Sequence, residues 1–398
     1  MPRIVSHRAG FWIVAASFVT VMAYSTVPTP LYPLYQERDG FPVSVITLIF
    51  AAYAVGVVFS LFFVGHISDW AGRRRMLVIA VLVSVVSAVL FLLWSSVPGL
   101  LLARFVNGVS IGILTATATA HLGELRARAR PGEGAVVAAS VAGAANLGGL
   151  ALGPLIGGIF AEYLPAPLEL PHAVFLVLLV IVAVLLAFVP ETAASAGERP
   201  GYRPQRLAFP PASRPAFIAA GFGAFASFAL FGLFTSLAPT FLIDAFHETD
   251  HLVAGATAFS VFAAAATAQV LLSPVGLHRQ LTIAIAAAAI GLIGIAVGAV
   301  LPQLAVFVIG GIIAGAGVGI LFRSSIMTAG ALSEPHRRGE TLALIFLIAY
   351  CGLALPVLAV GISLTFASET TVLLVFSSLV LLATVGAGVV MRRRARAR

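Results

Sequence analysis

Twelve apolar runs, each about 20 residues long, restrict the fold of this chain more than any other feature. As an α-helix, a run of this length crosses the hydrocarbon core of a bilayer, which is about 30 Å thick. Lipid offers the backbone no hydrogen-bond partners, so only helices or a closed barrel can cross it, and these runs are too long for barrel strands. We therefore expect an all-α membrane protein with 12 transmembrane helices. The expected spans are residues 10–29, 43–64, 76–96, 99–120, 135–160, 172–190, 214–236, 253–275, 281–300, 303–327, 341–365 and 371–391.

The composition excludes several other classes of protein. The chain of 398 residues is 60% hydrophobic and 10% charged, with a mean hydropathy of +1.08, so a soluble fold would lack polar residues to cover its surface. All 23 basic residues are arginine, and without lysine the chain cannot form a P-loop. The net charge of +8 does not indicate a nucleic-acid partner, because twenty arginines fall in the loops of one side, as in a membrane protein with a fixed orientation.

The distribution of arginine also predicts the topology. An even number of spans places both termini on one side, and the arginines before the first span and after the last predict that this side is the cytoplasm. We read residues 10–29 as the first span rather than as a signal peptide, because the segment is long and no small-residue cleavage site stands out. The predicted location is the cell inner (cytoplasmic) membrane, with multiple passes.

The longest polar stretch divides the spans into six and six. It is rich in Pro, Ala and Arg and has no periodicity, which is typical of a flexible linker. We therefore expect an N-terminal bundle at 1–190, a cytoplasmic linker at 191–213 and a C-terminal bundle at 214–398.

The two halves repeat short pieces of sequence. Gly149-Leu150-Ala151-Leu152 recurs at Gly352, and Gly112-Ile113-Leu114 recurs at Gly319. The offsets are 203 and 207 residues, close to the 204 that separates the starts of the first and seventh spans. Such a repeat predicts an internal duplication and two pseudo-symmetric six-helix bundles, an architecture that transporters use with the binding site between the halves.

A short charged turn joins the second and third spans. It contains Asp69 among the basic residues Arg73, Arg74 and Arg75, with Gly65 and Gly72 allowing a tight reversal. Three arginines are explained by the positive-inside rule alone, but the acid suggests a local charge network as well.

This turn resembles the signature loop of the major facilitator superfamily, written G-x-x-x-D-x-x-G-R-R/K. Gly65, Asp69, Gly72, Arg73 and Arg74 fall on that pattern, at the expected place between the second and third spans. The resemblance implies a central cavity lined by spans one, four, seven and ten, which opens alternately to each side as the two halves rock.

The same resemblance implies roles for charged residues of the loop. Asp69 is expected near the N-terminal end of the eleventh span when the cytoplasmic side is shut, and Arg73 is expected to pair with Glu124 at the end of the fourth span. In the second half, Pro274 to Arg279 stands where this loop would recur and has no acid.

The fourth span contains one charged residue, Arg104, with Asn107 on the same helix face. At 1.5 Å per residue, Arg104 lies roughly 8 Å inside the external end of the span. Two interpretations remain open: the side chain extends to the outer surface, or it faces the cavity and binds substrate or tunes a proton site. The superfamily pattern in this span is R-x-x-Q-G, and Asn107 keeps the amide of the glutamine.

The fifth span has a stripe of small residues. Gly149, Gly153 and Gly157 recur every fourth residue, which allows close packing of a neighbouring helix, and Pro154 bends the span. With Gly158 the order G-x-x-x-G-P-x-x-G-G resembles the fifth-span motif of antiporters in the superfamily, although Ser140 replaces an earlier glycine. This resemblance favours export over import.

Several further residues could line the cavity. Tyr32 and Tyr35, among the prolines that end the first span, are expected in an interfacial belt. Phenylalanines recur every third residue in the seventh span, and one or two of them are expected to line an aromatic cavity. The remaining polar residues at depth are more typical of helix–helix hydrogen bonds than of ligands. The full set of cavity candidates is Tyr24, Tyr53, Arg104, Asn107, Asn146, Phe228, Phe231, Gln269 and Tyr350.

No acid and no histidine is predicted near the centre of a span, so the coupling ion is open although the motifs suggest protons. The best-placed acids are Glu162 and Asp244. We expect a monomeric exporter of a small hydrophobic molecule, coupled to protons by antiport and with no cofactor or metal. A uniporter or importer of a metabolite, or a non-transporting receptor, are the alternatives. Without an H-E-x-x-H motif or a cluster of metal ligands, an enzyme is not expected.

Overall fold

The computed structural model describes residues 5–64, 67–133, 135–193, 204–210, 214–334 and 337–396, except for the side chains of Asp69 and Arg396. Long helices make up most of this part of the chain, and no strand occurs within it. Twelve of the helical segments are long and apolar enough to cross a membrane, which confirms the expected 12-helix, all-α fold.

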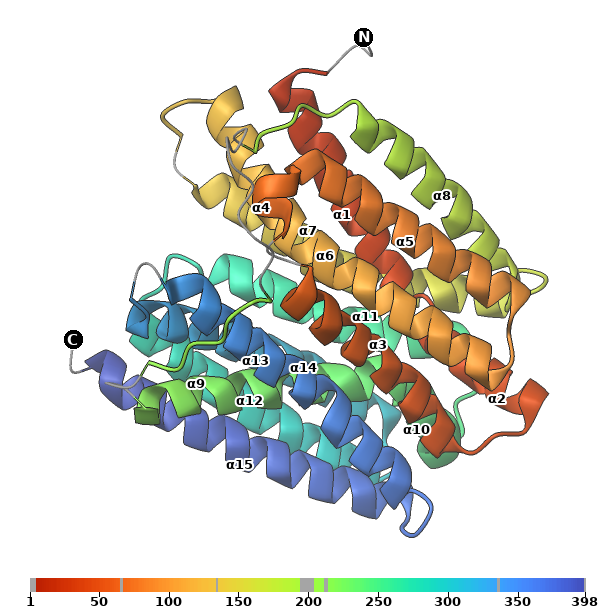
Figure 1. The fold of residues 1–398 in the computed structure, drawn as a ribbon. Helices are drawn as coiled ribbons and strands as arrows, with labels where there is room; N and C mark the ends of the chain where they lie inside the picture. The colour runs from red at the N-terminus through yellow and green to blue at the C-terminus, as the bar shows by residue number, and fades with distance from the viewer. Residues whose placement is uncertain are drawn as a thin grey trace. The chain divides into compact units, whose positions relative to one another are not determined.

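Figure 1 shows the helices in the order of the chain. In the first half they are α1 (His7–Thr26), the short 3-10 helix η1 (Thr29–Leu31), α2 (Tyr32–Asp39), α3 (Val43–Phe63), α4 (Ser68–Ala71), α5 (Arg73–Leu93), α6 (Val97–Ala129), α7 (Val136–Tyr163) and α8 (Leu170–Ala187). In the second half they are α9 (Arg214–Ser236), α10 (Ala238–Phe246), α11 (His251–Leu271), α12 (Leu277–Val300), α13 (Leu304–Leu332), α14 (Arg338–Ser363) and α15 (Glu369–Arg396).

The chain forms two compact units. The first contains residues 1–28 and 52–205, and the second contains residues 29–51 and 206–398. The segment 29–51 groups with the second unit, where Thr29 Oγ1 donates a hydrogen bond of 2.8 Å to the carbonyl of Thr235. The division into six and six spans at a linker over 191–213 stays a prediction.

The first span does not end at its prolines. After α1 the chain passes through η1 and continues in α2, so that one segment from His7 to Asp39 is a candidate span. Tyr32 and Tyr35 are 2% and 0% exposed. The expected interfacial belt at these two tyrosines is therefore wrong, because other parts of the protein cover both rings.

The two units repeat one packing pattern. In the first, α1 packs against α6, α7 and α8, and α5 packs against α6 and α8. In the second, α9 packs against α13, α14 and α15, and α12 packs against α13 and α15. The partners correspond one to one in chain order, as the internal duplication predicts.

Glycines produce matching close approaches in both units. A Cβ added to Gly108 of α6 would overlap the carbonyl oxygen of Tyr53 in α3. A Cβ added to Gly315 of α13, 207 positions later, would lie 2.5 Å from the carbonyl oxygen of Val261 in α11. Backbones this close leave no room for a side chain, which explains why glycine stands at both positions.

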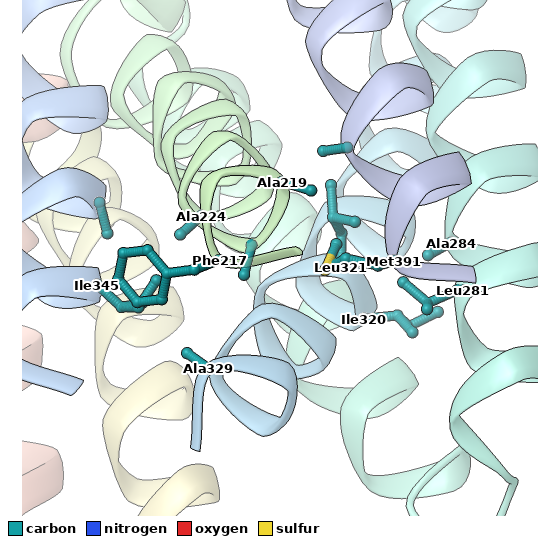
Figure 2. Packing of buried hydrophobic residues seen from close by; sticks show 13 residues of the cluster. Phe217, Ala219, Ala224, Leu281, Ala284, Ile320, Leu321, Ala329, Ile345 and Met391 are labelled. Atoms are coloured by element: carbon teal, nitrogen blue, oxygen red, sulfur yellow. The ribbon is translucent and has the colours of Figure 1, made fainter. Parts of the chain in front are cut away.

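The core of the second unit is built from apolar side chains of five helices. Figure 2 shows Phe217 of α9, Leu281 of α12, Leu321 of α13, Ile345 of α14 and Met391 of α15 in this cluster. All five are at most 1% exposed. Many other large apolar side chains are exposed on the surface of the protein. Contact of these side chains with lipid costs no free energy, whereas contact with water would.

Candidate functional site

The charged turn between α3 and α5 contains the short helix α4. Gly65 lies outside the described residues, and so does the side chain of Asp69, whose backbone belongs to α4. Gly72 has φ +103°, a conformation that L-residues rarely adopt, and it ends α4 and begins α5. The glycine of the motif is therefore required by the backbone of the turn.

Arg73 connects the turn to α6, as the resemblance to the major facilitator superfamily implies. Its guanidinium lies 3.2 Å from Glu124 Oε1, and its Nη1 donates a hydrogen bond of 2.8 Å to Ser68 Oγ. The other oxygen of Glu124 accepts a short hydrogen bond from the hydroxyl of Thr192. The Arg73–Glu124 pair thus joins α4, α5 and α6 with the segment after α8.

Glu191 caps the first turn of α5. Its two carboxylate oxygens accept the backbone N–H groups of Arg73 at 2.8 Å and of Arg74 at 3.2 Å. Burial opposes the charged form, but bonds from the backbone N–H groups of Ala193, Thr192 and Arg73 prevail and lower the pKa of Glu191 below its ordinary value. A carboxylate at a helix N-terminus also compensates the helix dipole.

Further side chains hold the segment after α8 in place. Arg128 donates to the carbonyls of Glu191 and Thr192, at 3.2 and 2.6 Å. His121 is fully buried in α6, and its Nε2 lies 3.1 Å from the carbonyl oxygen of Pro190. Arg75 is exposed and has no partner among the described residues. These contacts hold Pro190-Glu191-Thr192 against α5 and α6.

Arg104 is buried inside the first unit. It is 2% exposed, its Nη1 donates a hydrogen bond of 2.7 Å to the carbonyl of Ser25, and its guanidinium lies 4.6 Å from the ring centroid of Tyr53. The side chain therefore does not extend to the outer surface. It connects α6 to α1 and α3, with a cation–π contact to Tyr53 that is strengthened by desolvation.

Asn107 follows Arg104 by one helical turn and is 1% exposed. Neither atom of its amide has a hydrogen-bond partner among the described residues. A buried amide of this kind costs free energy as long as it has no hydrogen-bond partner.

Sequence reasoning missed His172, which is fully buried in the first turn of α8. Its Nδ1 lies 3.2 Å from the hydroxyl of Tyr24, and its ring stacks on Phe91 at 4.4 Å with an interplanar angle of 7°. The predicted sixth span begins at residue 172, and the prediction gives His172 no role. Its only sequence signal is that it is a polar residue at the start of an apolar run.

The glycine stripe of α7 packs against α1. A Cβ at Gly149 would lie 2.8 Å from the carbonyl oxygen of Val19, and one at Gly153 would overlap that of Ala23. Thr26 adds a hydrogen bond of 3.1 Å to the carbonyl of Leu150. Pro154 lies inside the helix, and Gly157 and Gly158 are buried. At Gly149 and Gly153 the backbone of α7 therefore lies directly against α1.

The second unit contains an aromatic cluster around Phe228 of α9. The ring of Phe228 lies 4.8 Å from Phe322, 5.3 Å from Tyr350 and 6.1 Å from Phe231. Phe231 in turn stacks on Phe262 at 4.8 Å. The structure thus brings together three of the predicted cavity residues: Phe228, Phe231 and Tyr350.

The remaining predicted polar residues have different surroundings. Gln269 of α11 donates a hydrogen bond of 2.9 Å to the carbonyl of Gly319 in α13, and its own backbone carbonyl accepts one of 3.3 Å from Arg323. It therefore forms the helix–helix bond expected of such a residue. Asn146 is half-buried in α7, away from the contacts described above.

In α6, Gly108-Val109-Ser110-Ile111-Gly112 has the G-x-S-x-G spacing of a hydrolase nucleophile. Such a serine sits on a turn between a strand and a helix. Here Ser110 lies within α6, fully buried, and its hydroxyl bonds to the carbonyl of Ala80 and to Ser84 Oγ. This geometry does not expose a nucleophile. No group of three or more potential metal ligands occurs in the described part of the chain.

The acids that the sequence offers for proton coupling lie at the ends of spans. Asp244 is on the exposed side of α10, where partial desolvation and then repulsion from Glu369 raise its pKa. Glu162 is in the last turn of α7.

Solved structures with the same fold are transporters. The chain resembles the human organic anion transporter MFSD10 (TETRAN), with 17% identity and a TM-score of 0.66 over 96% of this chain and 100% of that one. It resembles a point mutant of the nucleoside transporter NupG, with 13% identity and a TM-score of 0.69 over 98% and 99%. A bacterial homologue of the human lysosomal transporter Spinster gives 15% identity and a TM-score of 0.69 over 98% and 95%. Identities this low show the fold alone.

One curated relative matches part of the sequence. It is an uncharacterized MFS-type transporter of Methanocaldococcus jannaschii, 26% identical over 151 residues, and the match spans 38% of this chain and 37% of the relative. A family model described as Major Facilitator Superfamily matches residues 13–357, and the chain belongs to this superfamily.

Proposed function

We propose that this protein is a secondary active transporter that exports a small hydrophobic molecule by alternating access, in exchange for protons. Membership of the superfamily supports transport, since its solved relatives with this fold are transporters. The antiporter-like motif of α7 supports export, and its glycines pack α7 directly against α1.

The observation that carries the proposal most is the environment of Arg104. A guanidinium buried within a membrane span is costly, by about 2.5–3.5 kcal/mol on insertion scales, and is retained where it has a function. Arg104 bonds to the carbonyl of Ser25, next to Tyr24 in α1, and lies over the ring of Tyr53. A cation in an aromatic and apolar environment suits a neutral or anionic hydrophobic substrate better than a cationic one.

The contacts of the turn between α3 and α5 act as a cytoplasmic latch, that is, they help to hold the cytoplasmic side shut. Contacts among Arg73, Glu124 and Glu191 fix the turn between α3 and α5, to which Asp69 belongs. Asp69 then stabilises the state in which the cytoplasmic side is shut, as the superfamily motif implies.

The orientation belongs to the same proposal. Both termini face the cytoplasm, because the arginines concentrate in the loops of that side. The protein acts as a monomer in the inner membrane, with its substrate, protons and the bilayer as partners.

The proposal is tested on cells that overexpress the protein, using a panel of toxic hydrophobic compounds of neutral, anionic and cationic charge. Export predicts that cells with the protein tolerate higher concentrations of at least one neutral or anionic compound. Proton coupling predicts that a protonophore removes this tolerance. Arg104→Ala is expected to remove it as well, and Arg214→Gln, an exposed arginine at the start of α9, serves as the matched control.

The alternative transport modes give different results. A uniporter or importer would leave tolerance unchanged or reduce it, and counterflow in vesicles clamped at equal pH would continue at the full rate. A panel in which no compound is exported, or in which the protonophore has no effect on export, contradicts proton-coupled export.

A further inference from the structure

His172 is a titratable side chain inside a membrane span. It lies in the first turn of α8 and is 0% exposed. Its ring stacks on Phe91 of α5, and its Nδ1 lies 3.2 Å from the hydroxyl of Tyr24 in α1. An ionisable residue within a span is costly, and it is typically retained where it takes part in the movement of an ion or a proton. The contacts of His172 therefore bear on the proton that the proposed exchange needs.

Tyr24 is a hydrogen-bond partner that suits both protonation states of the imidazole. A phenol hydroxyl can donate to Nδ1 while that nitrogen carries no proton, and it can accept from Nδ1–H once the ring is protonated. Tyr24 is 1% exposed, and its ring meets that of His172 edge-on, with the centroids 6.0 Å apart. The bond between the two residues can thus persist when a proton arrives, with its direction reversed.

His121 has a different kind of partner. It is the other fully buried histidine among the described residues, and its Nε2 lies 3.1 Å from the carbonyl oxygen of Pro190. A carbonyl oxygen only accepts, so this contact fixes one nitrogen as a donor. The contact between His172 and Tyr24 is therefore the one better suited to a change of protonation.

Arg104 is the charged residue that acts on His172. It is 2% exposed, and its Nη1 donates a hydrogen bond of 2.7 Å to the carbonyl of Ser25, which follows Tyr24 in α1. A proton on His172 would add a second positive charge to these surroundings. Like charges repel far more strongly in a buried site than in water, so this charge would oppose the bond between Arg104 and Ser25.

The other elements near His172 contribute few ionisable groups. α8 also packs against α5 and α7. From α5 the ring meets Phe91, which does not ionise. The acids at this end of the helices are Glu162, in the last turn of α7, and Glu169, which directly precedes α8. Because His172 is in the first turn of α8, a proton has to pass only this helix end and not the whole span.

We propose that His172 and Tyr24 form the proton-binding site of the transporter, and that the proton enters at the start of α8, from the external side. The protonated ring repels Arg104 from its bond with Ser25, and so removes the guanidinium from the position in which it binds the substrate. Proton and substrate therefore bind in alternation, which is the condition for antiport. The inference rests on the proposed function, because it takes the substrate to bind at Arg104.

The first test measures how binding of a probe depends on pH. The full-length protein is placed in phosphatidylcholine nanodiscs, and the probe is anilinonaphthalene sulfonate, whose sulfonate stays ionised over the range used. The signal is the part of the binding that Arg104→Ala removes. In the wild type, Kd is expected to be at least about fivefold higher at about pH 5.5 than at about pH 7.5, because the proton competes with the probe.

Two histidine variants show which residue causes this dependence. His172→Gln keeps a hydrogen-bonding side chain next to Tyr24 but takes up no proton, so its Kd is expected to change less than about twofold between the two pH values. His247→Asn is the matched control, because His247 is exposed after the end of α10, and it is expected to follow the wild type. The unfolding temperature shows that each variant is folded. A folded His172→Gln variant with the pH dependence of the wild type would overturn the proposal.

The second test observes the proton directly and needs no probe. Nuclear magnetic resonance of the wild type with isotope-labelled histidine identifies the His172 signal as the one that His172→Gln lacks. This signal is expected to change to that of a protonated imidazole on acidification to about pH 5.5. A His172 ring that stays unprotonated at about pH 5 would overturn the proposal. If no probe binding depends on Arg104, the proposed function is contradicted, and this signal still decides whether His172 binds the proton.

Discussion

The carboxylate of Glu191 accepts a hydrogen bond of 2.8 Å from the backbone N–H of Arg73. The bond connects the segment after α8 with the first turn of α5, and Glu191 also accepts the N–H of Arg74. Because Arg73 pairs with Glu124 through its side chain, one residue joins two acidic groups from different parts of the chain. The charged turn of the superfamily motif is thus fixed by contacts far apart in the sequence.

Removing this cap should destabilise the first unit. Glu191→Ala is expected to lower the free energy of unfolding by about 1–2 kcal/mol, because it leaves N–H groups at the start of α5 without an acceptor. The measurement is denaturant unfolding in detergent. Glu133→Ala is the matched control, because Glu133 is part of surface ion pairs with Arg126 and Arg130, and it is expected to lower the free energy of unfolding less than Glu191→Ala does.

The contribution of Glu191 should also depend on pH. Its pKa is lower in the folded protein than the ordinary value of 4.5, so its stabilising effect is complete above pH 4.5 and is lost as the pH falls through the folded pKa. The gap in unfolding temperature between wild type and Glu191→Ala is therefore expected to shrink on acidification below pH 4.5. A gap that stays constant or widens in that range contradicts the assignment of the cap to the ionised form.

The contact between α7 and α1 can be tested with a pair of glycines. Gly153→Ala is expected to cost about 1–3 kcal/mol and to reduce transport, because the new Cβ would overlap the backbone carbonyl of Ala23. Gly148→Ala, in the same helix, meets nothing within 4 Å and is expected to change stability by less than about 0.5 kcal/mol. Unfolding temperature and transport are measured for both. Equal effects of the two substitutions would mean that the stripe is not a packing surface.

Transport should require the guanidinium group of Arg104 and not only a positive charge at this position. A lysine cannot reproduce both the bond to Ser25 and the contact with the Tyr53 ring, so Arg104→Lys is expected to lose at least about tenfold in kcat/KM for an exported anionic compound. The unfolding temperature of each variant shows whether the protein remains folded. Export by folded Arg104→Lys and Arg104→Ala at the wild-type rate would show that Arg104 is structural only.

The latch role of Asp69 predicts a loss of transport without a loss of folding. Asp69→Asn is expected to abolish export while leaving expression, insertion and unfolding temperature unchanged, because the neutral amide no longer compensates a helix N-terminus. Asp39→Asn is the control for the loss of an acid elsewhere in the chain. Among the ion pairs of the described residues, the Asp39 carboxylate pairs only with the neighbouring Arg38. Undiminished transport by Asp69→Asn counts against the latch.

The spans could be predicted because each depends on local composition. The predicted ends differ where helices leave the membrane: α6 continues to Ala129, although its apolar run ends near residue 120. The last turns of α6 carry Arg126 and Arg128, so no hydropathy pattern marks them, and they are stabilised by contacts such as that of Arg128 with Thr192. Helix ends of this kind depend on tertiary packing.

The candidate site could be predicted in part, for a related reason. Arg104 stands out as the one charge in its apolar run, and the Arg73–Glu124 pair follows from the superfamily motif. His172 and the capping role of Glu191 were missed because they depend on residues more than 100 positions away, Tyr24 and Arg73. One polar residue at the edge of an apolar run gives no signal of such a partner.

The most direct test of proton-coupled export uses the purified protein in liposomes with an imposed pH gradient. A fluorescent hydrophobic anion is added, and its movement across the membrane is followed together with internal pH. The account predicts that the probe moves only when the gradient is present, that protons move in the opposite direction, and that a protonophore or Arg104→Ala stops both fluxes. Probe movement at the rate of protein-free liposomes, or movement with no proton flux, would contradict it.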